Sequence, residues 1–200
     1  MAHTRAAIVS LVAVMAARPI AAQWDLGLEL TTMRYRGTVH NTTDSGPPNV
    51  RPSDATTVAL RLDRTVSHVR IGLRASYGKS GVTFSGPELA ITDKAGTQVF
   101  EGSALASFQV VGIGRGSSGA IRAEVGPALH LWKSGDELRN RLAALGAAAY
   151  EWPVADRFSG SIRFEGTISK SWFNAGDLPP AYERRATWRY GVSLGLRYRL

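Results

Sequence analysis

Histidine is the side chain of this sequence best suited to acid–base or metal chemistry, and it is scarce. The chain has four histidines and no cysteine. His130 stands on an alternating segment, whereas His40 and His68 fall in connections without companion ligands, so no zinc site is expected. No serine lies two residues from His130 to form a nucleophile–base pair, and we predict no nucleophile elbow. We therefore predict no catalytic, cofactor-binding or metal-ligating residue and no cofactor, and we expect His130 to bond a carboxylate.

Charged residues recur on one face of the alternating segments. Three segments place an arginine two residues before an acid: Arg61/Asp63, Arg122/Glu124 and Arg163/Glu165. The whole polar face carries Asp25, Glu29, Asp63, Glu101, Glu124 and Glu165 with Arg61, Arg70, Arg74, Arg122, Arg163, Arg189, Arg197 and Arg199. Inside a narrow barrel these charges are expected to pair across strands and plug the lumen, where loss of one partner costs about 3–5 kcal/mol. The alternative is a solvated outer face of a soluble barrel, where each pair contributes about 0–1 kcal/mol.

Period-two alternation positions these side chains, because successive residues of a strand point to opposite faces. The last segment has one face of Tyr190, Val192, Leu194, Leu196, Tyr198 and Leu200 and another of Arg189, Gly191, Ser193, Gly195, Arg197 and Arg199. The other alternating segments are 24–36, 56–64, 69–78, 99–113, 120–132, 139–152 and 158–170. Val110 and Val111 break the phase of the fourth segment. Segment 139–152 is alanine-rich with ambiguous facing, and a helix is its local competitor.

The connections alternate in length along the chain. Segment 37–55 is predicted to be neither strand nor helix, and 79–98 is a second long connection in which Val82, Phe84, Leu89 and Ile91 can extend the strands as a hairpin. Short turns are expected at 65–68, 114–119 and 153–157, a medium loop at 133–138 and a long loop at 171–186. An even number of antiparallel strands with long connections at one end and tight turns at the other is typical of a transmembrane barrel.

The first 22 residues read as a cleaved signal peptide. Met1–Arg5 is a charged start, 6–17 is apolar and the small residues before Gln23 suit cleavage. Twelve apolar residues are too few for a spanning helix, although a retained anchor is the alternative. Removing residues 1–22 leaves 22 basic and 16 acidic side chains, a net charge of +6. The basic charges are dispersed, so we expect a basic lumen or rim rather than a nucleic-acid partner. One barrel domain, 23–200, uses the remaining chain.

Two further patterns indicate that the apolar face of the strands points outward. Glycine and serine concentrate on the polar face, as the narrow interior of eight strands requires. Aromatic residues gather at the strand ends in two groups, as in the two interfacial belts of a membrane protein: Trp24, Trp152, Phe158 and Tyr198 at the short-turn end, and Tyr77, Phe100, Trp188 and Tyr190 at the long-loop end. We therefore predict an all-β fold, an eight-stranded antiparallel up-and-down transmembrane β-barrel.

With this architecture the chain resembles the small eight-stranded outer-membrane β-barrel proteins of the OmpA/OmpX-like class. The resemblance covers 23–200 and rests on architecture, its most specific element being the C-terminal strand. It implies recognition of that strand by the barrel-assembly machinery through Tyr198 and Leu200, although leucine replaces the more usual phenylalanine. It also implies periplasmic chaperones in transit and no separate peptidoglycan-binding domain. Expected partners are outer-membrane lipid and lipopolysaccharide, with no nucleic acid, and the expected state is a monomer.

The function predicted from the sequence is an integral outer-membrane protein with a charged, largely plugged lumen and surface loops for structural or interaction roles, without catalysis. One alternative is an exported, soluble, lipocalin-like barrel that binds an apolar ligand inside. Another is a lipid A-modifying barrel enzyme using His130. The loop 171–186 carries apolar residues that suit either self-packing, rest on the membrane interface, or a binding patch: Trp172, Phe173, Leu178, Pro179, Pro180 and Tyr182.

Overall fold

A computed structural model describes residues 23–43, 49–85, 90–114, 119–178 and 180–200. The predicted signal peptide, Leu89, Pro179 and most of the predicted turn 114–119 lie outside these residues. The described elements are β1 (Trp24–Asn41), β2 (Asn49–Pro52), β3 (Ala55–Val66), β4 (Val69–Ser85), β5 (Ala90–Ile113), β6 (Gly119–Ser134), β7 (Glu137–Ala155), β8 (Phe158–Ser169), a 3₁₀ turn η1 (Ala175–Asp177) and β9 (Tyr182–Arg199).

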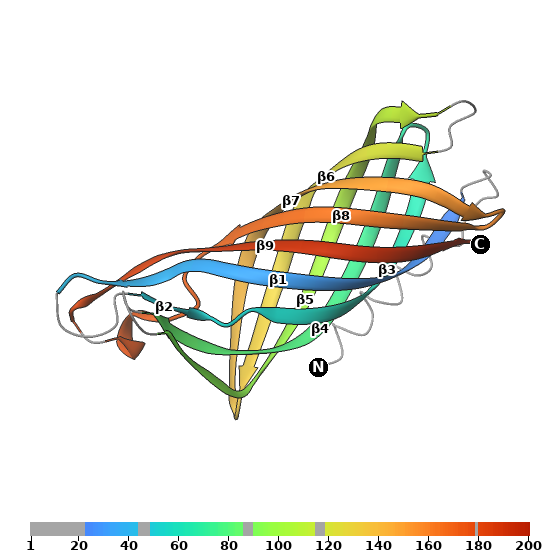
Figure 1. Cartoon of the computed structure of the whole chain (residues 1–200). Helices are drawn as coiled ribbons and strands as arrows, with labels where there is room; N and C mark the ends of the chain where they lie inside the picture. Colours follow the sequence, from blue (N-terminus) through green and yellow to red (C-terminus); the bar gives the residue numbers. More distant parts are fainter. Residues whose placement is uncertain (1–22, 44–48, 86–89, 115–118, 179) are drawn as a thin grey trace, which may run out of the picture.

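Eight of these strands close into a ring, as predicted. Each neighbouring pair is antiparallel in the order β1-β3-β4-β5-β6-β7-β8-β9, and β9 returns to pair with β1. Closure is in register, with Leu28 opposite Leu60 on β3 and Leu196 on β9. Figure 1 shows the strands crossing obliquely around a common axis, as closure of a twisted sheet requires. No helix among the described residues is long and apolar enough to cross a membrane.

The two ends of the barrel differ. At the short-turn end, where Trp24 and Leu200 lie, Ser67–His68 and Asp156–Arg157 are tight turns. At the opposite, long-loop end, β1, β4 and β5 run on beyond the ring, and the short strand β2 pairs with both β1 and β4 (Figure 1). The wall therefore rises unevenly above the part that all eight strands share.

Side chains alternate as the pattern predicted, with polar groups inside and apolar groups outside. On β9, Leu194 is 63% exposed whereas its neighbour Ser193 is 1% exposed. The same contrast separates Leu60, 60% exposed, from Arg61 at 1%. A soluble lipocalin-like barrel would have the opposite facing, so that alternative is contradicted.

Three sequence expectations about the connections were wrong. Segment 37–55 contains strand, because β1 continues to Asn41 across a bulge at Gly37. Gly37 has φ +80°, and a side chain there would meet the Ala186 carbonyl oxygen at 2.2 Å. The expected medium loop 133–138 is a tight turn at Gly135–Asp136, and the expected loop 171–186 gives way to β9 at Tyr182.

The ambiguous segment 139–152 is strand throughout. β7 pairs with β6 from Glu137 to Glu151, so the ladder on its two sides overrides the helix propensity of its alanines. The phase break at Val110–Val111 is a β-bulge, since the register with β6 shifts between Gln109 and Val111.

Candidate functional site

The centre of the lumen is an arginine–carboxylate cluster. Arg61 donates through both Nη atoms to Glu124, at 3.0 and 2.7 Å, and Arg163 donates to the same carboxylate at 2.7 Å. Arg61 also donates to Asp63 of its own strand at 2.8 Å, and Arg163 similarly bonds Glu165. Two of the three Arg-x-acid repeats, Arg61/Asp63 and Arg163/Glu165, therefore pair within their strands as well as across the lumen. Each of these side chains is at most 1% exposed.

A second group lies toward the long-loop end. Arg74 links Glu29 and Glu101 at 2.8 and 2.9 Å. Arg189 lies between Glu101 and Glu165, at 2.9 Å from the latter. His130 has its Nε2 atom 3.0 Å from the same Glu101 carboxylate and is 3% exposed. The expectation that His130 faces a carboxylate inside the barrel is confirmed.

The third group lies toward the short-turn end and contains a residue that the sequence reasoning missed. Glu151 of β7 accepts from Arg70 at 2.8 Å and from Arg197. The ambiguous facing of alanine-rich β7 concealed it, although Trp152 and Tyr150 beside it gave a usable phase. The expected pairing of the lumen charges across strands does not extend to Arg122, which donates to the hydroxyl and carbonyl of Ser107, at 2.8 and 3.1 Å.

Part of the lumen wall is apolar. Leu105, Ala128 and Leu145, from β5, β6 and β7, form a buried cluster with Ala143 and Ala147 packed against it. The charges therefore face one apolar side and do not line the lumen evenly. Arg199, the last of the predicted lumen cations, is exposed at the rim.

The long-loop mouth is filled by aromatic residues. Trp172, from the segment after β8, packs on Trp132 with ring centroids 5.5 Å apart, and Trp132 packs edge-on to Tyr35 at 5.5 Å. Met33 joins them, and Trp172 is 6% exposed. Of the readings left open for 171–186, self-packing applies to Trp172. Trp132 shares the inward face of His130, two residues away, so its place was readable from the sequence.

Hydrogen bonds hold this segment in the mouth. Ser171 donates its hydroxyl to the Thr38 carbonyl at 2.8 Å. Arg141 donates to the carbonyls of Ser171 and Trp172, at 2.6 and 2.8 Å, and to the Asn174 side chain at 2.8 Å. The 171–174 segment is thereby attached to two walls, β1 and β7.

One motif escaped the sequence reasoning. Gly191-Val192-Ser193-Leu194-Gly195 has the Gly-x-Ser-x-Gly spacing of a nucleophile elbow. That motif needs a sharp strand-to-helix turn, but here it lies within β9, and Ser193 shares a 2.8 Å hydrogen bond with Thr31. His40 lies on the β1 extension and not in a connection, and His68 lies in the turn between β3 and β4. The described residues contain no group of three His, Cys, Asp or Glu placed to hold a metal.

The outer surface carries the expected aromatic belts. At the long-loop end, Tyr77 and Phe100 pair at 4.8 Å, and Trp188 and Tyr190 are 47% and 44% exposed. At the short-turn end, Phe158 packs on Tyr198 at 5.0 Å. Between the belts the exposed side chains are apolar on every strand of the ring. Lipid is the surrounding that such a band requires.

Solved structures share the fold of this barrel. Neisserial surface protein A aligns over 88% of this chain and 96% of its own, with a TM-score of 0.57 at 8% identity. The outer membrane protein OprG from Pseudomonas aeruginosa aligns over 90% and 96%, with a TM-score of 0.58 at 9% identity. The chain has the fold of a small eight-stranded outer-membrane β-barrel. No family model and no curated protein sequence matches it.

A third structure extends the comparison to lipid. The outer membrane protein AlkL, determined by solid-state NMR in DMPC bilayers, covers 90% of each chain with a TM-score of 0.53 at 10% identity. At such identities the likeness concerns the fold. Together with the apolar band of this eight-stranded outer-membrane barrel, it supports the predicted location in the cell outer membrane.

Proposed function

We propose that this barrel is an integral outer-membrane protein whose lumen is occluded by its own charges and whose long-loop end serves structural or interaction roles. The observation that carries the proposal is the near-complete internal pairing of the lumen. Among the described residues, six arginines and seven carboxylates are buried in the interior, and a seventh lumen arginine, Arg70, is 14% exposed. The numbers of opposite charges are equal, and all of these groups except Arg122 lie within 4 Å of an opposite charge. Such pairing leaves little drive for water or ions to enter.

Two obstructions act in series along the axis. The Arg61–Glu124–Arg163 cluster occupies the middle of the lumen. Trp172 and Trp132 occupy the long-loop mouth. Eight strands enclose an interior only wide enough for side chains, so either obstruction suffices to block a solute.

A non-catalytic role is part of the proposal. His130 lies inside the barrel against Glu101, whereas a lipid substrate would approach from the outer face. Ser193 is bonded to Thr31 and does not contact His130. A lipid A-modifying role would require a reactive group at the outer surface, and unchanged lipid A mass spectra in His130→Ala cells are the expected result.

The remaining partners follow from the same architecture. We propose that the barrel-assembly machinery reads the C-terminal strand β9, whose Tyr198 and Leu200 close it against β1. We propose contact with outer-membrane lipid and lipopolysaccharide along the apolar band, a monomeric state and no nucleic-acid partner. The dispersed surface cations, which lack a basic run, support the last point.

Single-channel recording in planar bilayers tests occlusion. The folded protein, confirmed by heat-modifiable gel migration and by protection from protease in vesicles, is expected to give no stable conductance steps. An Arg61→Ser/Glu124→Ser/Trp172→Ala variant, which removes both obstructions, should conduct and so demonstrates insertion. Stable steps from the wild-type protein would overturn occlusion. If the protein is not recovered in the outer-membrane fraction, or if it is soluble without detergent, the assignment to the membrane is itself overturned.

A further inference from the structure

The wall of the barrel is notched at the long-loop end. The last residue of β8 in the ladder is Ser169, opposite Ala143 on β7 and Thr187 on β9. Both neighbours continue, β7 back to Glu137 and β9 back to Tyr182. Beyond Ser169, toward the long-loop end, no described strand therefore lies between β7 and β9. The 170–178 segment crosses the barrel there instead. A cleft of about 1150 Å³ opens there.

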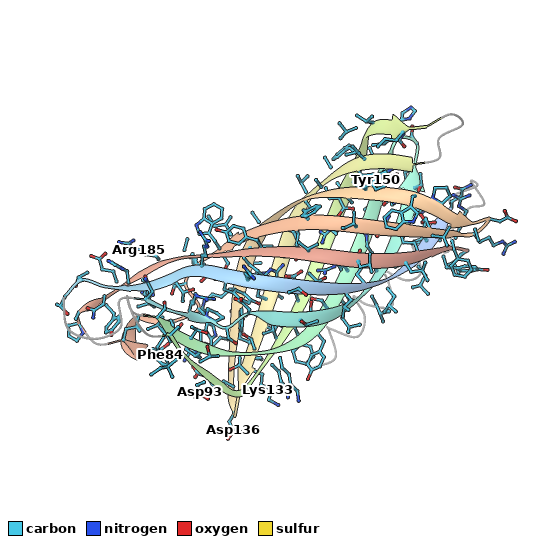
Figure 2. All side chains as sticks on the ribbon, in the orientation of Figure 1. Phe84, Asp93, Lys133, Asp136, Tyr150 and Arg185 are labelled. Carbon is cyan, nitrogen blue, oxygen red and sulfur yellow. The ribbon has the colours of Figure 1, made fainter. Side chains whose placement is uncertain are left out.

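Cations dominate the upper part of this cleft. Its lining includes four, Arg141, Lys170, Arg184 and Arg185, and one carboxylate, Glu183. In Figure 2, Arg185 lies on the β9 extension, away from the hairpin ends that carry Asp93 and Asp136. Of the acids at this end of the barrel, Glu183 is the one that lines the cleft.

These cations are not neutralised within the part of the chain that the structure describes. Arg141 donates only to neutral acceptors, three backbone carbonyls and the Asn174 side chain. Lys170, Arg184 and Arg185 are exposed and form no ion pair with a described carboxylate. By contrast, Arg139, two residues before Arg141 on β7, is paired with Glu137 and Asp177, each at 2.8 Å.

The lower edge of the cleft is apolar and faces outward. Leu142 of β7 is 75% exposed and Ile168 of β8 is 37% exposed. Phe173 lines the inner side. The cleft thus has a cationic part farther from the bilayer centre (the upper part) and an apolar part nearer to it (the lower part). This distribution complements the charged head and apolar chains of an anionic amphiphile.

The position of the cleft along the membrane normal matches that of the outer headgroup layer. Trp188 and Tyr190, on the outward face of β9, mark the membrane interface. Arg184 precedes Trp188 by four residues on β9. At about 3.3 Å per residue and a tilt of about 40°, it lies about 10 Å farther from the bilayer centre. That is where charged headgroup atoms lie and acyl chains begin just below.

We propose that this cleft binds the phosphorylated headgroup of an anionic glycolipid of the outer leaflet. Lys170, Arg184 and Arg185 contact its phosphates, and Ile168 and Leu142 contact the first methylenes of its acyl chains. The proposal rests on the outer-membrane function proposed above and names one lipid partner and its site. A free phosphate ion would contact the cations of the cleft but not its apolar edge.

Binding of a defined lipid to the folded, detergent-solubilised barrel tests the proposal. The probes are bis-phosphorylated lipid A and its dephosphorylated counterpart in neutral detergent, read by microscale thermophoresis at 150 mM salt. The wild-type protein should prefer the bis-phosphorylated form at least tenfold. The Arg184→Gln/Arg185→Gln variant should lose about 25-fold in affinity for it, at about fivefold per cation near a headgroup layer, and nothing for the dephosphorylated form.

The matched control removes two cations that form no ion pair with a described carboxylate from the same end outside the cleft, as Lys79→Gln/Lys133→Gln. It should bind like the wild-type protein, and an equal loss would overturn the site in favour of general surface charge. Equal binding of the two lipids, or displacement of lipid A by millimolar inorganic phosphate, would also overturn it. Each binding sample is first checked by heat-modifiable migration. A folded barrel without lipid preference contradicts this cleft alone, whereas failure to fold in detergent contradicts the membrane function.

Discussion

Neutralising Glu124 distinguishes a dry, paired lumen from a hydrated one. Glu124 is 1% exposed and accepts hydrogen bonds from two arginines, Arg61 and Arg163, at 2.7–3.0 Å. Glu124→Gln keeps the shape but leaves excess positive charge in the centre, and its amide group points donors at donors. Breaking a buried pair by removing one partner costs about 3–5 kcal/mol. We expect the free energy of unfolding to fall by that amount.

A matched pair at the surface supplies the control. Glu137 accepts from Arg139 through both oxygens, each at 2.8 Å, and its side chain is 54% exposed. Glu137→Gln removes the same chemical group from the same kind of two-point contact. Because water screens this pair, its loss should lower the free energy of unfolding far less than the loss of Glu124 does.

Urea unfolding from lipid vesicles, followed by tryptophan fluorescence, measures both changes. The comparison requires reversible transitions with equal dependence on urea concentration for the three proteins. The expected result is a loss of about 3–5 kcal/mol for Glu124→Gln and a much smaller loss for Glu137→Gln. If Glu124→Gln costs no more than Glu137→Gln, water solvates the lumen charges, and both the reasoning and the proposed occlusion fail.

The other predictions concern the outer wall, the mouth and one surface carboxyl. Leu194→Arg at mid-strand should reduce folding stability in bilayers by about 2–4 kcal/mol, and Leu200→Arg at the strand end by about 0–1 kcal/mol. The same unfolding assay measures both, and equal costs would contradict the placement of Leu194 near the bilayer centre and Leu200 near its surface. Trp172→Ala should cost about 3–5 kcal/mol through lost aromatic packing, and an unchanged midpoint would show that Trp172 does not fill the mouth. Hydrogen bonds from Arg139 hold the pKa of Glu137 below its usual range. The Glu137 carboxylate therefore contributes to stability above its unfolded-state pKa, and this contribution is lost as pH falls through the folded-state pKa. NMR titration should show the pKa of Glu137 rising in Arg139→Gln.

Alternation carried most of what the sequence could predict. A two-residue period identifies both the strand and its two faces, so the facing of β9 and the lumen position of His130 were readable without coordinates. The ring order follows from consecutive antiparallel neighbours. These features depend on local pattern alone.

What the sequence could not show depends on contacts between distant segments. β2 is a strand because β1 and β4 both pair with it, although its asparagine and proline favour a turn. The alanine face of β7 has no polarity to give it direction, which concealed Glu151. Arg122 bonds Ser107 on the neighbouring strand β5 and no described carboxylate, because the register of β5 and β6 places that serine beside it.

The early end of β8 links the proposed occlusion to the proposed lipid cleft. Because β8 stops at Ser169 while β7 and β9 continue, the chain must cross the barrel mouth to reach β9, and this crossing carries Trp172 inward against Trp132. The same shortening leaves the outer notch that Lys170 and Arg184 line. Arg141 serves both sides, since its bonds to the crossing carbonyls fix the aromatic segment while its unneutralised charge lines the cleft. A full-length β8 would close the wall, remove the cleft and leave the mouth without its aromatic filling, so the two features have one structural cause.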